Sequence, residues 1–343
     1  MIEKPVNKQR EQPRPQNTTK ADVNEILFGY FLSPGPASDP FSIYSNKSEV
    51  VRAYNDKAEQ LPYDLWYMEL RRAEEMAKVF KDYAKKNGYG TKIAEVVWTA
   101  RNGSLGQAVG YSVPQTGPGK NPSDVIVRFS DSKKPRGKNS TKSKGGAWLG
   151  ASAKSTASGG EIAFANPGLG TISQDLFNNK QHLNKIIDKH KSAFIKKYSE
   201  LRGLSNSAMK QRLKQNPALM EEARIAGTVA LREVRDAIID RIVKLDYEDW
   251  QKFLLDFIQA DFQGPHYVKV TGQGNKEPFR AIIEDPAENK KTRGIRGPNL
   301  ILEDIGDNSI LVYSYEGKKL FRIRMKWESA PMVTSIKLSG DPA

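Results

Sequence analysis

The segment from residue 121 to residue 155 reads NPSDVIVRFSDSKKPRGKNSTKSKGGAWLGASAKS, and it decides how the fold is interpreted. Two short apolar stretches within it, 123–129 and 147–155, have the length and the composition of β-strands. They are joined by a loop rich in Lys, Gly and Ser, so the segment predicts a hairpin with a basic tip. Asp124 stands at the start of the first strand and Lys154 near the end of the second. Antiparallel pairing would place this acid and this cation side by side.

The composition of the chain limits the classes of function. Its 343 residues are enough for two ordinary domains, or for one large domain with an appendage. The chain has 54 Lys and Arg residues and 40 Asp and Glu residues, which gives a net charge of +14. Such a charge favours a polyanionic partner, most often nucleic acid. A basic protein without such a partner is the alternative. The lack of cysteine excludes disulfides, zinc thiolates and thiol nucleophiles, and three histidines are too few for a histidine-rich metal site.

Targeting and membrane signals are not found in the sequence. No apolar run approaches the ~18 residues needed to cross a bilayer. The first twenty residues are polar and do not resemble a signal peptide. We therefore expect a cytoplasmic protein that has no membrane partner.

Composition and periodicity predict four regions along the chain. Residues 1–22 are polar and basic, as in a flexible arm. Residues 23–180 combine helical and strand patterns and predict an α/β core. Residues 181–262 have a mainly helical period, with Pro217 and Gly203 as breaks. Residues 263–343 alternate with period two and predict a C-terminal antiparallel β domain.

One acid of the α/β region falls among apolar residues. The segment 63–90 has the period of a helix that ends at its glycines, and Glu69 lies within its apolar stripe. An acid that points toward a core needs a partner or a function. Pairing with Arg72 or Arg101 would satisfy Glu69 without any catalytic role.

The order of these features resembles the core of the PD-(D/E)XK nuclease superfamily, which includes restriction endonucleases and Holliday-junction resolvases. The resemblance covers residues 60–180 and rests on Asp124 in PSD and on Lys154 in SAK. It implies an α/β (α+β) fold with a mixed sheet flanked by helices, and a role for Asp124 as a metal ligand. Lys154 would be the group that activates water, and Glu69 would match the acid that the superfamily often carries on a helix. The implied cofactor is Mg²⁺ or Mn²⁺, because a metal neutralises the scissile phosphate and acidifies a bound water.

The sequence departs from the superfamily motif at Ser152, which stands where a second Asp or Glu is usual. Some restriction enzymes with serine here recruit the acid from a neighbouring helix or strand. The candidates in this chain are Glu69, Glu161, Asp175 and Glu95. Of these we place Glu69 and Glu161 with Asp124 as metal ligands, and Ser152 with the catalytic residues. Without a recruited acid the site would bind metal weakly.

Each of these candidate site residues can also be explained without a catalytic role. Asp124 is equally typical of a turn before a strand, and Lys154 of a solvated strand end. Glu95 lies in the polar phase of an alternating strand, where an outward side chain is expected. The co-occurrence of the acid and the lysine in the right order favours the nuclease interpretation.

Two groups of cations are candidate contacts to the phosphate backbone of DNA. The first occupies the hairpin tip and comprises Lys133, Lys134, Arg136, Lys138, Lys142 and Lys144. The second alternates along one strand near the C-terminus and comprises Arg322, Arg324 and Lys326. A solvated surface is the alternative for both groups.

Together these features predict a metal-dependent DNA endonuclease, of the kind made by bacteria or by phages in an infected host cell. Double-stranded DNA is the expected partner. A homodimer is a further expectation, because many enzymes of the superfamily dimerise to cut both strands. The alternatives are a catalytically inactive DNA-binding protein on the same scaffold and a viral structural or assembly protein.

Overall fold

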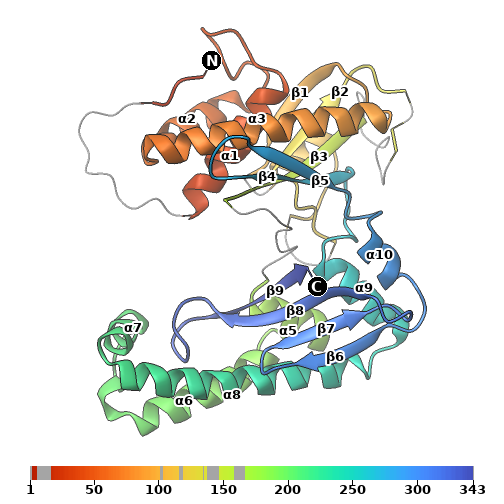
Figure 1. The fold of residues 1–343 in the computed structure, drawn as a ribbon. Helices are drawn as coiled ribbons and strands as arrows, with labels where there is room; N and C mark the ends of the chain where they lie inside the picture. Colours follow the sequence, from red (N-terminus) through yellow and green to blue (C-terminus); the bar gives the residue numbers. More distant parts are fainter. Residues whose placement is uncertain are drawn as a thin grey trace. The chain divides into compact units, whose positions relative to one another are not determined.

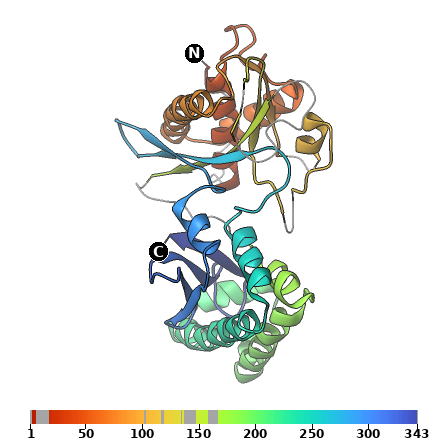
Figure 2. The same ribbon diagram turned by 90° about the vertical axis from the view of Figure 1, so that its right-hand side faces the viewer.

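The computed structural model describes residues 2–5, 17–100, 103–115, 119–133, 135–136, 147–157 and 167–342. The chain forms two compact units, shown as ribbons in Figures 1 and 2. One unit comprises residues 1–162 and 262–287, and the other comprises residues 163–261 and 288–343. Each unit is therefore built from two separate stretches of chain.

These units differ from the four regions expected from the sequence. Helix α1 (Asn17–Leu32) begins inside the expected N-terminal arm. Strand β4 (Tyr267–Gln273) falls in the expected C-terminal β domain, yet it pairs with β3 (Ala147–Thr156) in the first unit. Only residues 288–343 of the expected β domain share the second unit with the expected helical region. Periodicity identifies a strand locally, but it does not tell which sheet the strand joins.

The first unit contains a five-stranded mixed sheet with the order β1-β2-β3-β4-β5. Neighbouring strands are antiparallel except β3 and β4, which are parallel. A parallel neighbour requires a crossover connection, and here the crossover includes residues 163–261 of the second unit. The other elements are α2 (Lys47–Glu59), α3 (Tyr63–Lys86), β1 (Ile93–Trp98), α4 (Ser104–Val109), β2 (Val125–Phe129) and β5 (Arg280–Glu284).

The two faces of this sheet support separate apolar clusters. Val127 and its alternate neighbours point toward α1 and α3, where they pack with Phe28 and Phe80. Ile126 and Trp148 point to the opposite face, where they pack against α4. The period-two alternation of a strand produces this division. It also fixes which residues of β2 and β3 share a face.

The second unit packs helices against a four-stranded antiparallel sheet of order β6-β7-β8-β9. Strand β8 (Lys319–Trp327) presents Phe321, Ile323 and Met325 to this core. The remaining elements are α5 (Leu169–Phe177), α6 (His182–Lys197), the 3₁₀ turn η1 (Ser199–Leu201), α7 (Asn206–Gln215), α8 (Pro217–Ile242), α9 (Tyr247–Phe257), α10 (Lys290–Ile295), β6 (Ile301–Ile305), β7 (Ser309–Tyr313) and β9 (Ile336–Pro342). No helix within the described ranges is both long and apolar enough to cross a membrane. The protein is thus a mixed α/β protein with one mixed and one antiparallel sheet.

A polar cluster lies where β4 begins and β5 ends. His266 is fully buried, and its Nε2 lies 2.9 Å from Oδ2 of Asp285. The hydroxyl of Tyr83 donates to the same oxygen at 2.7 Å. Burial alone would raise the pKa of Asp285, but its contacts with His266, Tyr83 and the backbone N–H of Ala287 lower that pKa. The cluster therefore stabilises the ionised carboxylate.

The linkage of this carboxylate to folding gives a pH prediction. Because the pKa of Asp285 is lower in the folded state, its stabilising contribution is complete above the unfolded value of about 3.9. It is lost as the pH falls through the lowered folded value. We expect Asp285→Asn to reduce the free energy of unfolding by roughly 1–3 kcal/mol at neutral pH, with the difference shrinking below about pH 4. Urea unfolding at several pH values measures this, with the exposed Asp82→Asn as control; a pH-independent difference would contradict it.

Candidate active site

Asp124 lies directly before β2 and is fixed by its own backbone. Its N–H donates to the carbonyl of Ala151 at 2.8 Å, and its carbonyl accepts from the N–H of Thr99 at 3.0 Å. The residue is therefore held between β1 and β3 at the end of the sheet. Its side chain is 23% exposed, so the carboxylate is reachable from solvent.

The Asp124 carboxylate meets the Ser-Ala-Lys sequence of β3. Its Oδ2 accepts hydrogen bonds from the Lys154 ammonium at 2.9 Å, the backbone N–H of Ala153 at 2.8 Å and the Ser152 hydroxyl at 3.3 Å. The pairing of Val125 with Ala151 sets this register. Since side chains alternate along β3, Ser152 and Lys154 lie on one face. The structure thus brings together Asp124, Ser152 and Lys154 at the place expected for them.

A further acid, Glu25 of α1, belongs to this site. Glu25 is only 8% exposed, and its Oε2 accepts a hydrogen bond from the Trp98 indole at 2.9 Å. Burial, and next the negative charge of Asp124, raise the pKa of Glu25 well above its usual value, although Lys154 opposes this. The sequence interpretation missed Glu25 because its segment was not recognised as a helix. The available signal was a single acid within the apolar run from Val23 to Phe28.

Lys154 carries a proton at neutral pH in this environment. Burial lowers the pKa of its ammonium, but the negative charges of Asp124 and Glu25 outweigh burial, and the pKa is raised. Lys154 therefore acts as a cation and not as a proton acceptor. An ammonium beside two carboxylates is suited to stabilise negative charge that develops nearby.

Lys120 is a second lysine within the electrostatic reach of Asp124, and it too was missed. Burial lowers its pKa, with Asp124 opposing and Lys154 reinforcing this effect. Both neighbours of Lys120 bond to the backbone of Gln263. The Gly119 carbonyl accepts from the Gln263 N–H at 2.8 Å, and the side-chain amide of Asn121 donates to the Gln263 carbonyl at 2.9 Å. The loop sequence before Asp124 contains no repeating pattern that would have singled out Lys120.

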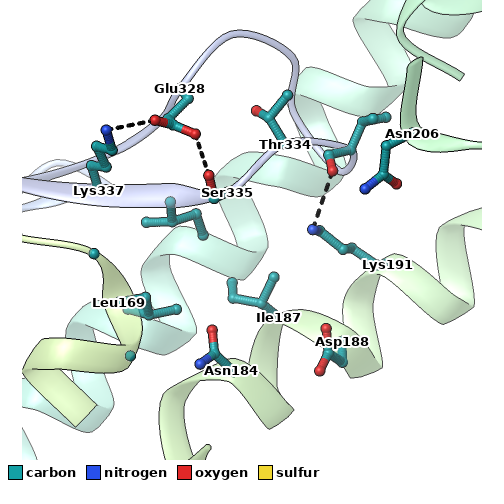
Figure 3. A pocket seen from close by; sticks show the side chains of 14 residues that line it. Leu169, Asn184, Ile187, Asp188, Lys191, Asn206, Glu328, Thr334, Ser335 and Lys337 are labelled. Carbon is teal, nitrogen blue, oxygen red and sulfur yellow. Dashed lines mark hydrogen bonds and ion pairs between the residues drawn. The ribbon is translucent and has the colours of Figure 1, made fainter. Parts of the chain in front are cut away.

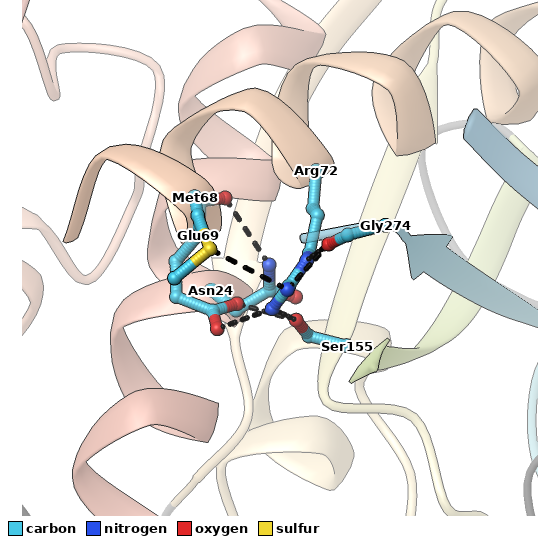
Figure 4. A network of polar contacts seen from close by, with 6 residues as sticks. All are labelled: Asn24, Met68, Glu69, Arg72, Ser155 and Gly274. Carbon is cyan, nitrogen blue, oxygen red and sulfur yellow. Dashed lines mark hydrogen bonds and ion pairs between the residues drawn. The ribbon is translucent and has the colours of Figure 1, made fainter. Parts of the chain in front are cut away.

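Glu69 is buried as expected, but its contacts lie elsewhere. Its Oε1 is 2.8 Å from the Arg72 guanidinium, and its Oε2 accepts a hydrogen bond from Ser155 (Figure 4). This is one of the two pairings that the sequence left open for Glu69. Among the described residues, no hydrogen bond or ion pair of Glu69 reaches Asp124. The structure therefore places Glu25, and not Glu69, beside the Asp124–Lys154 pair.

The other acids considered from the sequence are dispersed. Glu95 pairs with Arg128 at 2.9 Å across β1 and β2. Asp175 is exposed on α5 in the second unit. Glu161 lies outside the described residues.

The expected DNA-binding cations are only partly described. Lys134, Lys138, Lys142 and Lys144 lie outside the described residues. Lys133 and Arg136 are exposed, and their backbone N–H groups donate to the carbonyls of Gly88 and Asn87, just beyond α3. On β8 the guanidinium groups of Arg322 and Arg324 lie 3.6 and 2.8 Å from one carboxylate oxygen of Asp341, and Lys326 is exposed.

The side chains at the site include oxygen donors of the kind that bind a divalent metal. Within the described residues, no group of three or more His, Asp and Glu side chains is arranged to hold an ion. The site offers two carboxylates, Glu25 and Asp124. Mg²⁺ is commonly held by one or two carboxylates together with water and substrate phosphates. The donor chemistry thus fits Mg²⁺ bound jointly with a phosphate.

No protein-family model matches the chain. A search of curated proteins likewise finds no match. Support for the role of the candidate site therefore comes from its geometry.

The second unit contains a pocket that is an alternative candidate site. It has a volume of about 560 Å³ between α5, α6 and the start of β9, and its floor is apolar, with Ile187 and Leu169 (Figure 3). The Lys191 ammonium at its wall donates to the carbonyl of Val333, and burial lowers the pKa of Lys191. Glu328, also at its wall, is paired with Lys337 at 2.7 Å. The Asp124–Lys154 site is the stronger candidate for catalysis, because it brings together the acid and the lysine of the expected motif at a solvent-accessible carboxylate.

Proposed function

We propose that the chain is a Mg²⁺-dependent endodeoxyribonuclease that hydrolyses phosphodiester bonds in DNA. The observation that carries this proposal is the 2.9 Å contact between Asp124 and Lys154 at the ends of adjacent strands. Buried Glu25 stands beside this pair and adds the second carboxylate that Ser152 does not provide. Recruitment of an acid from a helix is the exchange expected for a motif with serine at this position.

The order of elements supports a restriction-endonuclease-like core. A helix with an inward acid precedes β1, Asp124 precedes β2, and Lys154 lies near the end of β3. The sheet of the first unit is mixed and has helices on both faces. This agreement in order and in residue type supports the resemblance to the PD-(D/E)XK superfamily.

Each residue of the site has a definite task in the proposed reaction. Glu25 and Asp124 would hold the metal, which supplies an acidified water and neutralises charge on the phosphate. The Lys154 ammonium stabilises the charge that develops on the phosphoryl oxygens as the bond to the leaving oxygen lengthens. The Ser152 hydroxyl and the Ala153 N–H orient the Asp124 carboxylate through the hydrogen bonds that they donate to it.

Double-stranded DNA is the substrate that the charge of the protein favours. A net charge of +14 raises the local concentration of a polyanion and speeds its association. The six cations of the hairpin tip and the three on β8 are proposed to contact phosphates without reading sequence. Homodimerisation and a cytoplasmic location in a bacterial or phage-infected cell complete the proposal.

Plasmid cleavage tests the proposed function directly. We expect supercoiled plasmid to be nicked or linearised with Mg²⁺ or Mn²⁺, and to stay intact when EDTA is in excess. Retained DNA binding without cleavage in either metal would favour the inactive DNA-binding protein. That alternative has one observation in its favour, the lack of a third ligand among the described residues. Absence of both binding and cleavage would end the proposal.

A further inference from the structure

Arg72 is the centre of a buried polar network in the first unit (Figure 4). Its Nη1 donates to Glu69 at 2.8 Å and to the Ser155 hydroxyl at 3.0 Å. Its Nε donates to the carbonyl of Gly274 at 2.7 Å. The Ser155 hydroxyl donates in turn to the other Glu69 oxygen. The Asn24 amide completes the network by donating to the Glu69 carbonyl at 3.3 Å.

This network joins four elements that are distant in sequence. Glu69 and Arg72 lie on α3, Asn24 on α1 and Ser155 near the end of β3. Gly274 is the residue that follows β4. The side chains of Glu69 and Arg72 are only 5% and 6% exposed, so the ion pair is almost completely removed from water.

Such a pair is poorly explained by stability alone. Desolvation of two charges offsets most of their attraction, and apolar residues of similar volume are often as stable. Burial raises the pKa of Glu69 even though Ser155 and Arg72 lower it. Ionisation of Glu69 in the folded protein therefore costs free energy. A buried network of this kind fixes geometry, because each member has few alternative partners.

The network contacts the chain directly beside two residues of the candidate site. Asn24 precedes Glu25, and Ser155 follows Lys154. Since side chains alternate along β3, Ser155 points toward Arg72 and Glu69 while Lys154 leaves the strand on the other side, toward Asp124. A clamp on Ser155 therefore limits the movement of the Lys154 backbone without touching its ammonium.

We propose that Glu69 and Arg72 are positioning residues, which hold the end of β3 against α3 so that Lys154 stays in contact with Asp124. This inference rests on the proposed nuclease function for its kinetic consequence, but its structural consequence is independent of that function. Loosening the clamp should displace Lys154 from Asp124. A displacement of about 1 Å at a reacting centre can lower the rate by up to roughly 100-fold.

The kinetic test uses a mild change in the network. Ser155→Ala removes one hydroxyl from the clamp and leaves Glu69 and Arg72 paired with each other. We expect kcat for plasmid cleavage to fall roughly 10- to 100-fold, with KM for DNA unchanged. Ser155→Thr, which keeps the hydroxyl, should restore most of the activity. Ser132→Ala is the matched control, because its hydroxyl bonds to Gly88 outside the network.

A second measurement keeps the inference testable if the protein does not cleave DNA. Acetylation of Lys154 by a water-soluble active ester, followed by mass spectrometry, reports how firmly Asp124 holds the ammonium. We expect several-fold faster labelling of Lys154 in Ser155→Ala and in the double variant Glu69→Gln/Arg72→Met, relative to exposed Lys85. Circular dichroism of each variant establishes that it is folded.

The outcomes separate the two proposals. Faster labelling with no cleavage by the wild type would end the nuclease proposal and retain the positioning role. Folded variants with wild-type labelling of Lys154 and wild-type kcat would overturn the positioning role and leave the nuclease proposal intact.

Discussion

Glu25→Gln is expected to abolish Mg²⁺-dependent cleavage and, at the same time, to make the protein more stable. The wild-type carboxylate is buried beside Asp124, and both burial and that neighbouring charge raise the pKa of Glu25. A folded pKa above the unfolded one means that stability declines as the pH rises from the unfolded value toward the folded value. Glutamine has the same shape and can still accept from Trp98, but it adds no negative charge. We expect an increase of roughly 0.5–2 kcal/mol in the free energy of unfolding at neutral pH in EDTA.

The proposed role of Glu25 as a metal ligand gives this prediction a second readout. Mg²⁺ that binds only the folded state raises the stability of the wild type in proportion to the logarithm of its concentration. The Glu25→Gln variant should show little of this effect. Thermal unfolding of both proteins in EDTA and in Mg²⁺ measures this difference in stabilisation. Glu49→Gln, at a partly exposed position of α2, is the control. A variant that cleaves normally, or that is less stable in EDTA, would contradict the assignment.

Lys154→Met should reduce the rate of cleavage by roughly 100- to 1,000-fold while binding to DNA persists. Methionine keeps the unbranched stem of the side chain but removes the ammonium that faces Asp124 at 2.9 Å. Because the raised pKa of Lys154 keeps it protonated, the lost contribution is electrostatic. The deficit should therefore be similar at every pH at which the wild-type lysine is charged.

Single-turnover cleavage and filter binding separate the chemical step from association with DNA. Lys154→Arg preserves the charge and should recover part of the rate, whereas Asp124→Asn should show a defect as large as that of Lys154→Met. Lys92→Met, at an exposed lysine directly before β1, is the matched control. If Lys154→Met cleaves at the wild-type rate, the proposed chemistry is wrong.

The sequence was most informative where the relevant contacts are local. The pairing of β2 with β3 was expected from two short strands close in the chain, and alternation along β3 is sufficient to place Ser152 and Lys154 on one face. Helix α3 was likewise predicted with Glu69 on its buried face. These features require no knowledge of distant segments.

Long-range pairing limited the rest of the prediction. Strand β4 was recognised as a strand, but its parallel partner β3 lies more than a hundred residues earlier in the chain. The same limitation applied to the acids. Glu69 and Glu25 both lie on helices within apolar surroundings, and only the fold distinguishes the acid that contacts Arg72 from the one beside Asp124.

The chain crosses three times between its two units, and this order has a consequence for folding during synthesis. During synthesis, β3 emerges long before residues 262–287, so one of its edges stays without a partner strand until β4 leaves the ribosome. An unpaired edge is a template for aggregation. A product that stops at residue 261 lacks β4 and should therefore precipitate.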